Sequence, residues 1–148
     1  MRYSSEILIE LPRKQVIDLF DDADNLFEWM KGLQSVELIF GEAGQVGAQS
    51  KMSFEMGKRH IAMVETILER NFPDYFKTAY ETKGVYNEVE NFFIEEGEIT
   101  RYRTVHYFRF DSWAMRLMAK LMPKAFKKQS MQYLKDFKAF AESNQEHD

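Results

Sequence analysis

The sequence predicts an α+β fold in which one strand and two short helices precede six antiparallel strands and a long C-terminal helix. Three observations lead to this prediction. Apolar and polar residues alternate with a period of two in seven segments between Tyr3 and Phe110. Glycine or proline separates nearly every pair of the later segments, and an amphipathic helical pattern follows them. We expect a single domain over residues 1–148, because a chain of 148 residues with 45% hydrophobic content can bury one core.

The first strand is predicted over Tyr3–Leu11, where the residues of one face are Tyr3, Ser5, Ile7 and Ile9. Pro12 suits the first position of the helix that follows, because that position needs no N–H donor. A second short helix, in the stretch ADNLFEWMKG, begins at Asp24 or Asn25 and ends at Gly32. Both helices therefore lie between the first strand and the second.

Six further strands are predicted by alternation, and together with the first they make seven. Their separators are GEAGQVG, MGK, NFPD, TKG and EEGE, and most are short enough to join antiparallel neighbours. The sequence therefore predicts a meander. Its strands are Val36–Phe40, Ala48–Met56, His60–Glu69, Tyr75–Glu81, Val85–Glu95 and Glu98–Phe110.

The stretch GEAGQVG, from Gly41 to Gly47, has the look of a phosphate-binding loop. Such loops depend on the helix that follows them, whose N-terminus points amide groups at the anion. This stretch lies between two predicted strands, and its spacing matches neither G-x-G-x-x-G nor G-x-x-x-x-G-K-[ST]. A hairpin connection with glycines at positive φ is the favoured interpretation.

The C-terminal helical pattern begins after a cap at Asp111 or Ser112 and continues to about Glu142. Pro123 leaves two alternatives open: the helix bends there, or a first piece ends near Met122 and the main helix begins with proline. One sector of the helical wheel is basic, with Arg116, Lys120, Lys124, Lys127, Lys128, Lys135 and Lys138. The opposite sector is apolar, with Met118, Met122, Ala125, Phe126, Tyr133, Phe137 and Phe140.

Composition narrows the function classes. The absence of cysteine excludes disulfides, thiolate nucleophiles and cysteine-ligated zinc. The start of the chain is too polar for a signal peptide, and no apolar run reaches the roughly 18 residues of a membrane helix, so we expect a cytoplasmic protein. A net charge of −4 argues against nucleic acid as a partner. The charge is uneven, because Trp113–Phe140 holds seven basic residues and one acidic residue.

The order of elements and three stretches resemble the START-like (SRPBCC) superfamily, most closely its polyketide cyclase/dehydrase branch. These stretches are EILIELPRKQVIDLFDDADNLFEWMKGL, GEAGQVGAQ and MQYLKDFKAFAE. The resemblance implies a helix-grip fold, in which a curved antiparallel sheet wraps around the long C-terminal helix. It also implies a cavity between them for an apolar or amphipathic small molecule. Members of the superfamily include lipid carriers, aromatic cyclases and quinone-binding proteins, so the fold alone does not select a function.

Alternation in TRYRTVHYFRF and VYNEVENFF predicts which side chains face such a cavity, because arginine and glutamate mark the solvent side. Polar groups in an apolar wall either orient a ligand or satisfy one another in a filled core. For His106 alone, a structural hydrogen bond is the favoured interpretation, whereas paired asparagines point more strongly to a ligand. The predicted residues are Asn87, Val89, Asn91, Tyr102, Thr104, His106 and Phe108.

Methionine and aromatic residues complete the predicted lining. Methionine adapts its shape at little cost, which suits a variable apolar ligand, although such residues more often fill a core. On the third strand these residues are Met52, Phe54 and Met56, and on the C-terminal helix they are Met118, Met122 and Phe126. Trp29 and Phe27 are candidates for the cavity mouth, or for ordinary packing.

Catalysis has less support. The sequence lacks H-E-x-x-H and G-x-S-x-G, and its histidines, His60, His106 and His147, are far apart, so we expect no metal site and no cofactor. Glu65 could face inward and form an acid/base pair with His106, because burial would raise its pKa. That strand has apolar residues on both faces, so Glu65 could equally face solvent.

The main hypothesis is a non-catalytic protein that binds or transports a lipid, quinone or polyketide-like molecule. The alternative is a cyclase or dehydratase that uses His106 with Tyr102, Glu65 or an asparagine, and a third is a regulatory module with a filled cavity. The lysine face is most simply solvated. It could also contact an anionic membrane transiently, since Leu117, Met131 and Leu134 fall near it. The sequence leaves the oligomeric state open.

Overall fold

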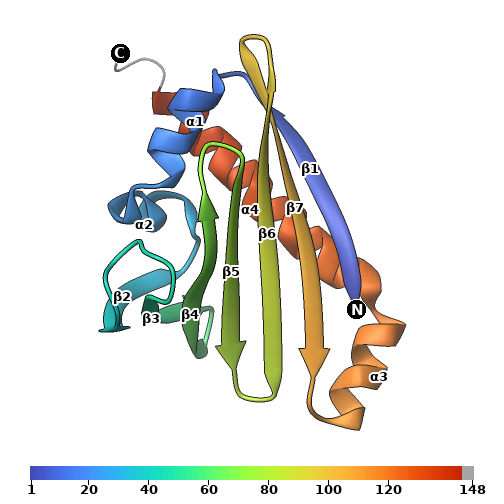
Figure 1. Cartoon of the computed structure of the whole chain (residues 1–148). Coiled ribbons are helices and arrows are strands. Elements are labelled where there is room, and N and C mark those ends of the chain that lie inside the picture. The colour runs from blue at the N-terminus through green and yellow to red at the C-terminus, as the bar shows by residue number, and fades with distance from the viewer. Residues whose placement is uncertain (145–148) are drawn as a thin grey trace.

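Seven antiparallel strands form one sheet in the order β1-β7-β6-β5-β4-β3-β2, and the long helix α4 crosses one face of it (Figure 1). The computed structural model describes residues 1–144. His147 lies outside the described residues. The elements are β1 (Arg2–Ile9), α1 (Arg13–Phe20), the 3-10 helix η1 (Ala23–Asn25), α2 (Leu26–Trp29), β2 (Leu33–Phe40), β3 (Gln49–Met56), β4 (Arg59–Asn71), β5 (Tyr75–Thr82), β6 (Val85–Glu96), β7 (Ile99–Phe110), α3 (Trp113–Leu121) and α4 (Pro123–Ser143).

The order of the strands follows from the lengths of their connections. Strands β2 to β7 are consecutive neighbours, as expected for strands joined by short glycine or proline turns. β1 pairs with β7 instead, so the segment with α1 and α2 must travel from one edge of the sheet to the other. Both helices therefore lie at one end of α4 (Figure 1). The predicted α+β class, seven strands and two helices after the first strand are confirmed.

Two strands differ from the prediction because their register shifts. β2 begins at Leu33 rather than Val36, and a bulge between Leu33 and Ser35 interrupts the alternation there. β4 extends to Asn71, and a second bulge lies between Ile67 and Glu69. A bulge moves the following side chains to the opposite face, so Arg70 lies on the inner face opposite Phe76.

Pro123 starts a new helix, which settles the alternatives left open by the sequence. α3 ends at Leu121, Met122 leaves helical geometry with φ −126° and ψ 50°, and Pro123 occupies the first turn of α4. The proline ring blocks continuation of the helix before it but is preorganised to begin one. At the other end of α3, the Ser112 hydroxyl accepts a hydrogen bond from the Met115 backbone N–H at 3.1 Å.

The stretch Gly41–Gly47 is the connection between β2 and β3, as predicted. Its three glycines have φ values of 79°, 80° and 92°, in the left-handed region that favours glycine. At Gly41 a Cβ atom would also lie 3.0 Å from the Ala48 Cα atom. The loop leads into a strand, so it has no helix N-terminus to bind phosphate.

The main core lies where α4 meets α1, β6 and β7. Phe137 of α4 is fully buried there, and its ring contacts those of Phe20, Trp29 and Tyr102 at 5.0 to 5.7 Å between centroids. The Phe93 ring stacks on Tyr102 at 4.8 Å. A second, smaller core beneath β2 to β4 contains Leu33, Met52 and Phe54.

Replacing Phe137 with alanine should lower the free energy of unfolding by about 3–5 kcal/mol, because the substitution removes a buried ring from a close-packed aromatic cluster. The measurement is urea unfolding followed by circular dichroism. Phe40→Ala is the matched control, since Phe40 is 64% exposed on β2 and its replacement should change stability by less than about 0.5 kcal/mol. Equal losses for both variants would contradict the assignment of the core.

Candidate ligand-binding cavity

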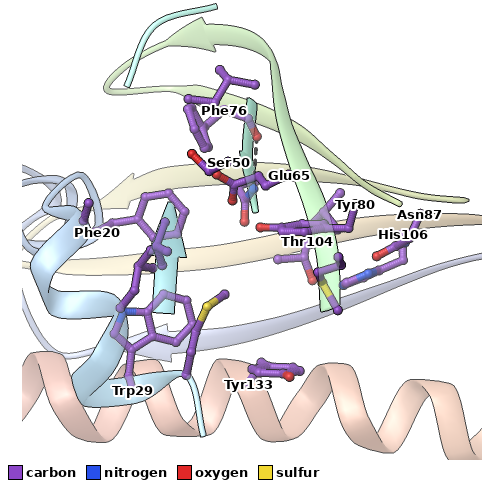
Figure 2. A pocket seen from close by; sticks show the side chains of 18 of the residues that line it. Phe20, Trp29, Ser50, Glu65, Phe76, Tyr80, Asn87, Thr104, His106 and Tyr133 are labelled. Atoms are coloured by element: carbon purple, nitrogen blue, oxygen red, sulfur yellow. Dashed lines mark hydrogen bonds between the residues drawn. The ribbon is translucent and has the colours of Figure 1, made fainter. Parts of the chain in front are cut away.

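A cavity of about 550 Å³ lies between the sheet and α4 (Figure 2). Its volume is within the range of small-molecule sites, roughly 300–1,000 Å³. β3 to β7 supply one wall, α4 supplies the opposite wall through residues such as Tyr133, and α1 and α2 cover one end with Phe20 and Trp29. Most of the lining is apolar or aromatic. The cavity therefore has the shape and polarity of a site for a hydrophobic molecule.

One row of inward side chains is polar. Ser50, Glu65, Tyr80 and Asn87 are direct register partners across β3, β4, β5 and β6, so they lie side by side on the inner face. Figure 2 shows Glu65 beside Ser50, with Tyr80 and Asn87 further along the same wall. The sequence left the direction of Glu65 open, and the structure places it inside. Because the polar row lies on one wall of the cavity, it can fix the orientation of a bound molecule.

Burial dominates the electrostatics of Glu65 and Tyr80. Loss of water around the Glu65 carboxyl raises its pKa, while interaction with the Tyr80 side chain acts in the opposite direction. Burial and the negative charge of Glu65 together raise the pKa of Tyr80 well above its ordinary value, so this phenol keeps its proton. The pair thus combines a carboxyl whose ionised form is costly with a hydroxyl available as a hydrogen-bond donor.

His106 lies on the adjacent row, on β7, and faces the cavity. Burial lowers its pKa to about 4, so the imidazole is neutral at pH 7. Its ring stacks on Tyr3 at 5.1 Å between centroids. The Tyr3 hydroxyl pairs with Ser130 at 2.6 Å and donates to the Phe126 carbonyl at 3.1 Å, so it is not available to the histidine. The His106 Nδ1 atom is buried and has no partner within residues 1–144.

The two asparagines of β6 differ in how far the protein satisfies them. The Asn91 amide donates to the Phe76 carbonyl at 3.1 Å, and its Oδ1 accepts from the Tyr102 hydroxyl at 2.6 Å. Both polar ends of Asn91, and the Tyr102 hydroxyl, are therefore used internally. Asn87 donates from Nδ2 to the Tyr107 carbonyl at 3.1 Å. Its Oδ1 atom has no hydrogen bond among the described residues, which leaves this acceptor for a ligand.

Two more buried polar atoms on the lining lack partners in the part of the chain that the structure describes. They are Trp29 Nε1 and Thr104 Oγ1. A buried donor or acceptor without a partner costs roughly 1–3 kcal/mol, and a bound molecule or water can supply the missing hydrogen bond. Together with Asn87 and His106, these groups give an occupant several places to form polar contacts.

An ion pair closes one side of the cavity opening. The Arg70 guanidinium on β4 donates to both carboxylate oxygens of Asp21, which follows α1, at 2.7 and 2.6 Å. It also donates to the Gly44 carbonyl at 3.2 Å and lies 4.7 Å from the centre of the Phe72 ring. Arg70, Asp21 and Gly44 all line the cavity. This contact therefore ties the α1 end and the β2–β3 loop together at the opening.

The structure brings most of the predicted site residues to the cavity wall. The alternation of polar and apolar residues in β6 and β7 predicted the largest number of these lining residues. The lining includes Trp29, Phe54, Asn87, Val89, Asn91, Tyr102, Thr104, His106 and Phe108, and also Phe27 and Glu65.

The four methionines predicted to line the cavity lie elsewhere in the structure, whereas Met30 and Met63 line it. Met52 is buried in the smaller core and Met56 packs beside it, because Leu26 and Met30 at α2 cover this part of the sheet. Met118 and Met122 are exposed near α3. The prediction treated α3 and α4 as one helical wheel, and the break at Pro123 changes the direction of every residue before it.

Phe126 also does not line the cavity. Its ring packs edge-on against Phe108 at 5.3 Å and Phe110 at 5.7 Å, where it closes the end of the cavity near α3. Sequence reasoning missed Phe20, Ser50, Arg70, Tyr80 and Tyr133, which all line the cavity. Tyr80 alternates with Phe76 and Thr78, and Ser50 alternates with Met52 and Phe54, so the same period could have found them.

Within residues 1–144 no group of three or more histidine, aspartate or glutamate side chains could hold a metal ion. No helix in this range combines the length and the apolar character that crossing a membrane requires.

Known proteins match the chain through structure alone. No protein-family model and no curated sequence matches it. A conserved protein from Geobacillus kaustophilus has 14% identity and a TM-score of 0.80, with 97% of each chain covered. The Zhui aromatase/cyclase from Streptomyces sp. R1128 has 13% identity and a TM-score of 0.79, with 97% of this chain and 94% of that chain covered.

Norcoclaurine synthase from Thalictrum flavum, solved in complex with dopamine and hydroxybenzaldehyde, has 12% identity and a TM-score of 0.74. The match covers 100% of this chain and 88% of that chain. Identities this low show the fold and not the activity. The chain therefore has the helix-grip fold of START-like (SRPBCC) proteins, with an antiparallel sheet wrapped around a long C-terminal helix.

Proposed function

We propose that this protein binds an amphipathic small molecule, with a hydrophobic body and one polar end, between the sheet and α4. The observation that carries the proposal is the cavity of about 550 Å³, whose lining is mostly apolar and aromatic and includes the polar row Ser50–Glu65–Tyr80–Asn87. An apolar wall gains free energy by releasing water to a hydrophobic ligand, while a few fixed polar groups set its orientation.

The polar row specifies which end of the ligand meets it. The Tyr80 hydroxyl keeps its proton and is a donor, whereas the Asn87 Oδ1 atom is an acceptor. A phenol, hydroxyl or carbonyl group satisfies these groups without bringing a charge into the buried row. A carboxylate at this position would lose its hydration in surroundings of low polarity. The proposed ligand is therefore a neutral phenol, ketone, quinone or alcohol rather than a free fatty acid anion oriented toward the row.

Two of the similar structures support the proposal of an aromatic ligand. One is an aromatase/cyclase, and the other was solved with dopamine and hydroxybenzaldehyde. They support binding of aromatic molecules as a property available to the fold. The supporting observation in this chain is its own combination of aromatic walls, from Phe20, Phe76 and Tyr133, with the unpartnered acceptor on Asn87.

A second candidate function is acid/base catalysis, and the position of Glu65 favours it. An ionised Glu65 could accept a proton from a carbon next to a carbonyl, while Tyr80 donates a hydrogen bond to the carbonyl oxygen. The sequence suggested His106 with Tyr102, Glu65 or an asparagine; this pair keeps Glu65 and replaces His106 with Tyr80, whereas the Tyr102 hydroxyl is engaged by Asn91. Catalysis predicts that Glu65→Gln abolishes ring closure or dehydration of a polyketide-like substrate and leaves its binding intact. Binding without turnover by the unmodified protein would reject it.

Val89→Phe should lower the affinity for the neutral fluorescent probe N-phenyl-1-naphthylamine by about tenfold or more, because the new ring fills space in the cavity. Val89 faces inward on β6. Ile94→Phe is the matched control, since Ile94 is on the exposed face of the same strand. Fluorescence titration gives the affinities, and native mass spectrometry tests for a molecule that purifies with the protein. Equal affinities for the two variants would place the probe outside the cavity and contradict the proposal.

Glu65→Gln should raise the free energy of unfolding increasingly as the pH rises from 4 to 8. The pKa of Glu65 is raised in the folded state, so the protonated form stabilises the fold at low pH and this stabilisation is lost as pH rises through the folded pKa. Glutamine imitates the neutral carboxyl and escapes the loss. Urea unfolding at several pH values measures the difference.

Glu37→Gln is the control for this experiment, because Glu37 is exposed on β2. Its effect on stability should vary less with pH than the effect of Glu65→Gln. A Glu65→Gln profile parallel to that of the unmodified protein would show that Glu65 does not become more difficult to ionise on folding.

A further inference from the structure

α3 presents an apolar surface to solvent. Trp113 is 73% exposed and Leu121 is 71% exposed, and with Leu117 they form a stripe with a spacing of four residues. Met118 and Met122 are exposed beside this stripe. Side chains of this size rarely gather on an exposed helix of a monomeric protein unless the surface contacts something. These five residues define the apolar face of α3.

The apolar face of α3 is exposed because the opposite side of the helix packs against the end of the sheet. Ala119 is buried on the opposite side, and the Met115 sulfur lies 3.5 Å from where a Cβ atom of Gly84 would be. The Arg116 guanidinium donates to the carbonyls of Phe110 and Asp111 at 3.0 and 3.2 Å. α3 therefore rests against the end of the sheet with its apolar face outward, at the opposite end of α4 from α1 (Figure 1).

Basic residues border the apolar face. Lys120 and Lys124 are beside it, and Lys127 and Lys128 follow on the first turns of α4. These four lysines are exposed and have no ion-pair partner within residues 1–144. The protein as a whole has a net charge of −4, so this concentration of positive charge is local.

We propose that α3 docks the protein on an anionic lipid bilayer. The apolar face would enter the boundary between headgroups and acyl chains, and the four lysines would contact lipid phosphates or carboxylates. Charge selects this occupant over a second copy of the chain. A symmetric dimer through α3 would place the same lysines against one another, whereas an anionic bilayer supplies the opposite charge over the whole area.

The sequence suggested membrane contact through Leu117, Met131 and Leu134, and of these three residues only Leu117 is exposed. Leu134 is buried and Met131 is half-buried, so neither extends to a membrane. Docking instead uses the α3 face, next to the turn between β5 and β6. Thr82 and Val85 on either side of that turn line the cavity. This orientation places one end of the cavity toward the bilayer, but docking itself does not depend on the proposed ligand.

The test is co-flotation of the whole protein with vesicles of phosphatidylcholine alone or of phosphatidylcholine mixed with phosphatidylserine. We expect binding to the mixed vesicles that is at least about tenfold stronger and that weakens with salt. The double variant Leu117→Ser/Leu121→Ser should reduce it about tenfold or more, and so should Lys120→Gln/Lys124→Gln. Emission from the exposed Trp113 should shift to shorter wavelength on binding.

Phe40→Ser is the control, because Phe40 is exposed on β2, away from α3. It should keep full vesicle binding, and thermal unfolding should show that every variant is folded. Val89→Phe should also keep it, which separates docking from ligand binding. Equal binding to both kinds of vesicle, binding to neither, or a dimer that the α3 variants dissociate would each overturn the proposal.

Discussion

The structure depends on aromatic packing that holds α4 against the sheet near both of its ends. At one end Phe137 enters the aromatic cluster formed with Phe20, Trp29 and Tyr102. At the other end Phe126 packs on Phe108 and Phe110. These rings are large enough to fix the separation of helix and sheet, since each contributes a large buried area. The space between the two contacts is the cavity, so the same packing that stabilises the fold also creates the site.

The hydrogen bond between Tyr3 and Ser130 shows how the molecule satisfies polar groups on this cavity wall without closing it. Tyr3 of β1 extends to α4 and forms contacts at 2.6 and 3.1 Å, and its ring supports His106. Asn91 and Tyr102 satisfy each other in the same way. Four polar atoms on the lining remain without a partner among residues 1–144, namely Asn87 Oδ1, Thr104 Oγ1, His106 Nδ1 and Trp29 Nε1. These atoms can form hydrogen bonds with a bound molecule.

The sequence predicted the fold well where a periodic pattern was uninterrupted. Alternation in β6 and β7 gave the inward faces correctly, including His106 and Asn87, because neither strand has a bulge. It failed where the pattern is ambiguous or geometry breaks the period. Apolar residues on both faces of IAMVETI hid the direction of Glu65, and Pro123 separated two helices that the wheel treated as one, which misplaced Met118 and Met122. Contacts between distant segments, such as Arg70 with Asp21, leave no periodic signal and could not be predicted.

The alignment of Ser50, Glu65, Tyr80 and Asn87 is a property of strand register rather than of any loop. One residue inserted into any of these strands would shift the register and turn part of the row to the outer face of the sheet. A single substitution changes one side chain of the row and leaves the others in place. Ligand specificity can therefore change through single substitutions within the row. Related chains should diversify by exchanging side chains along this line while conserving the lengths of β3 to β6.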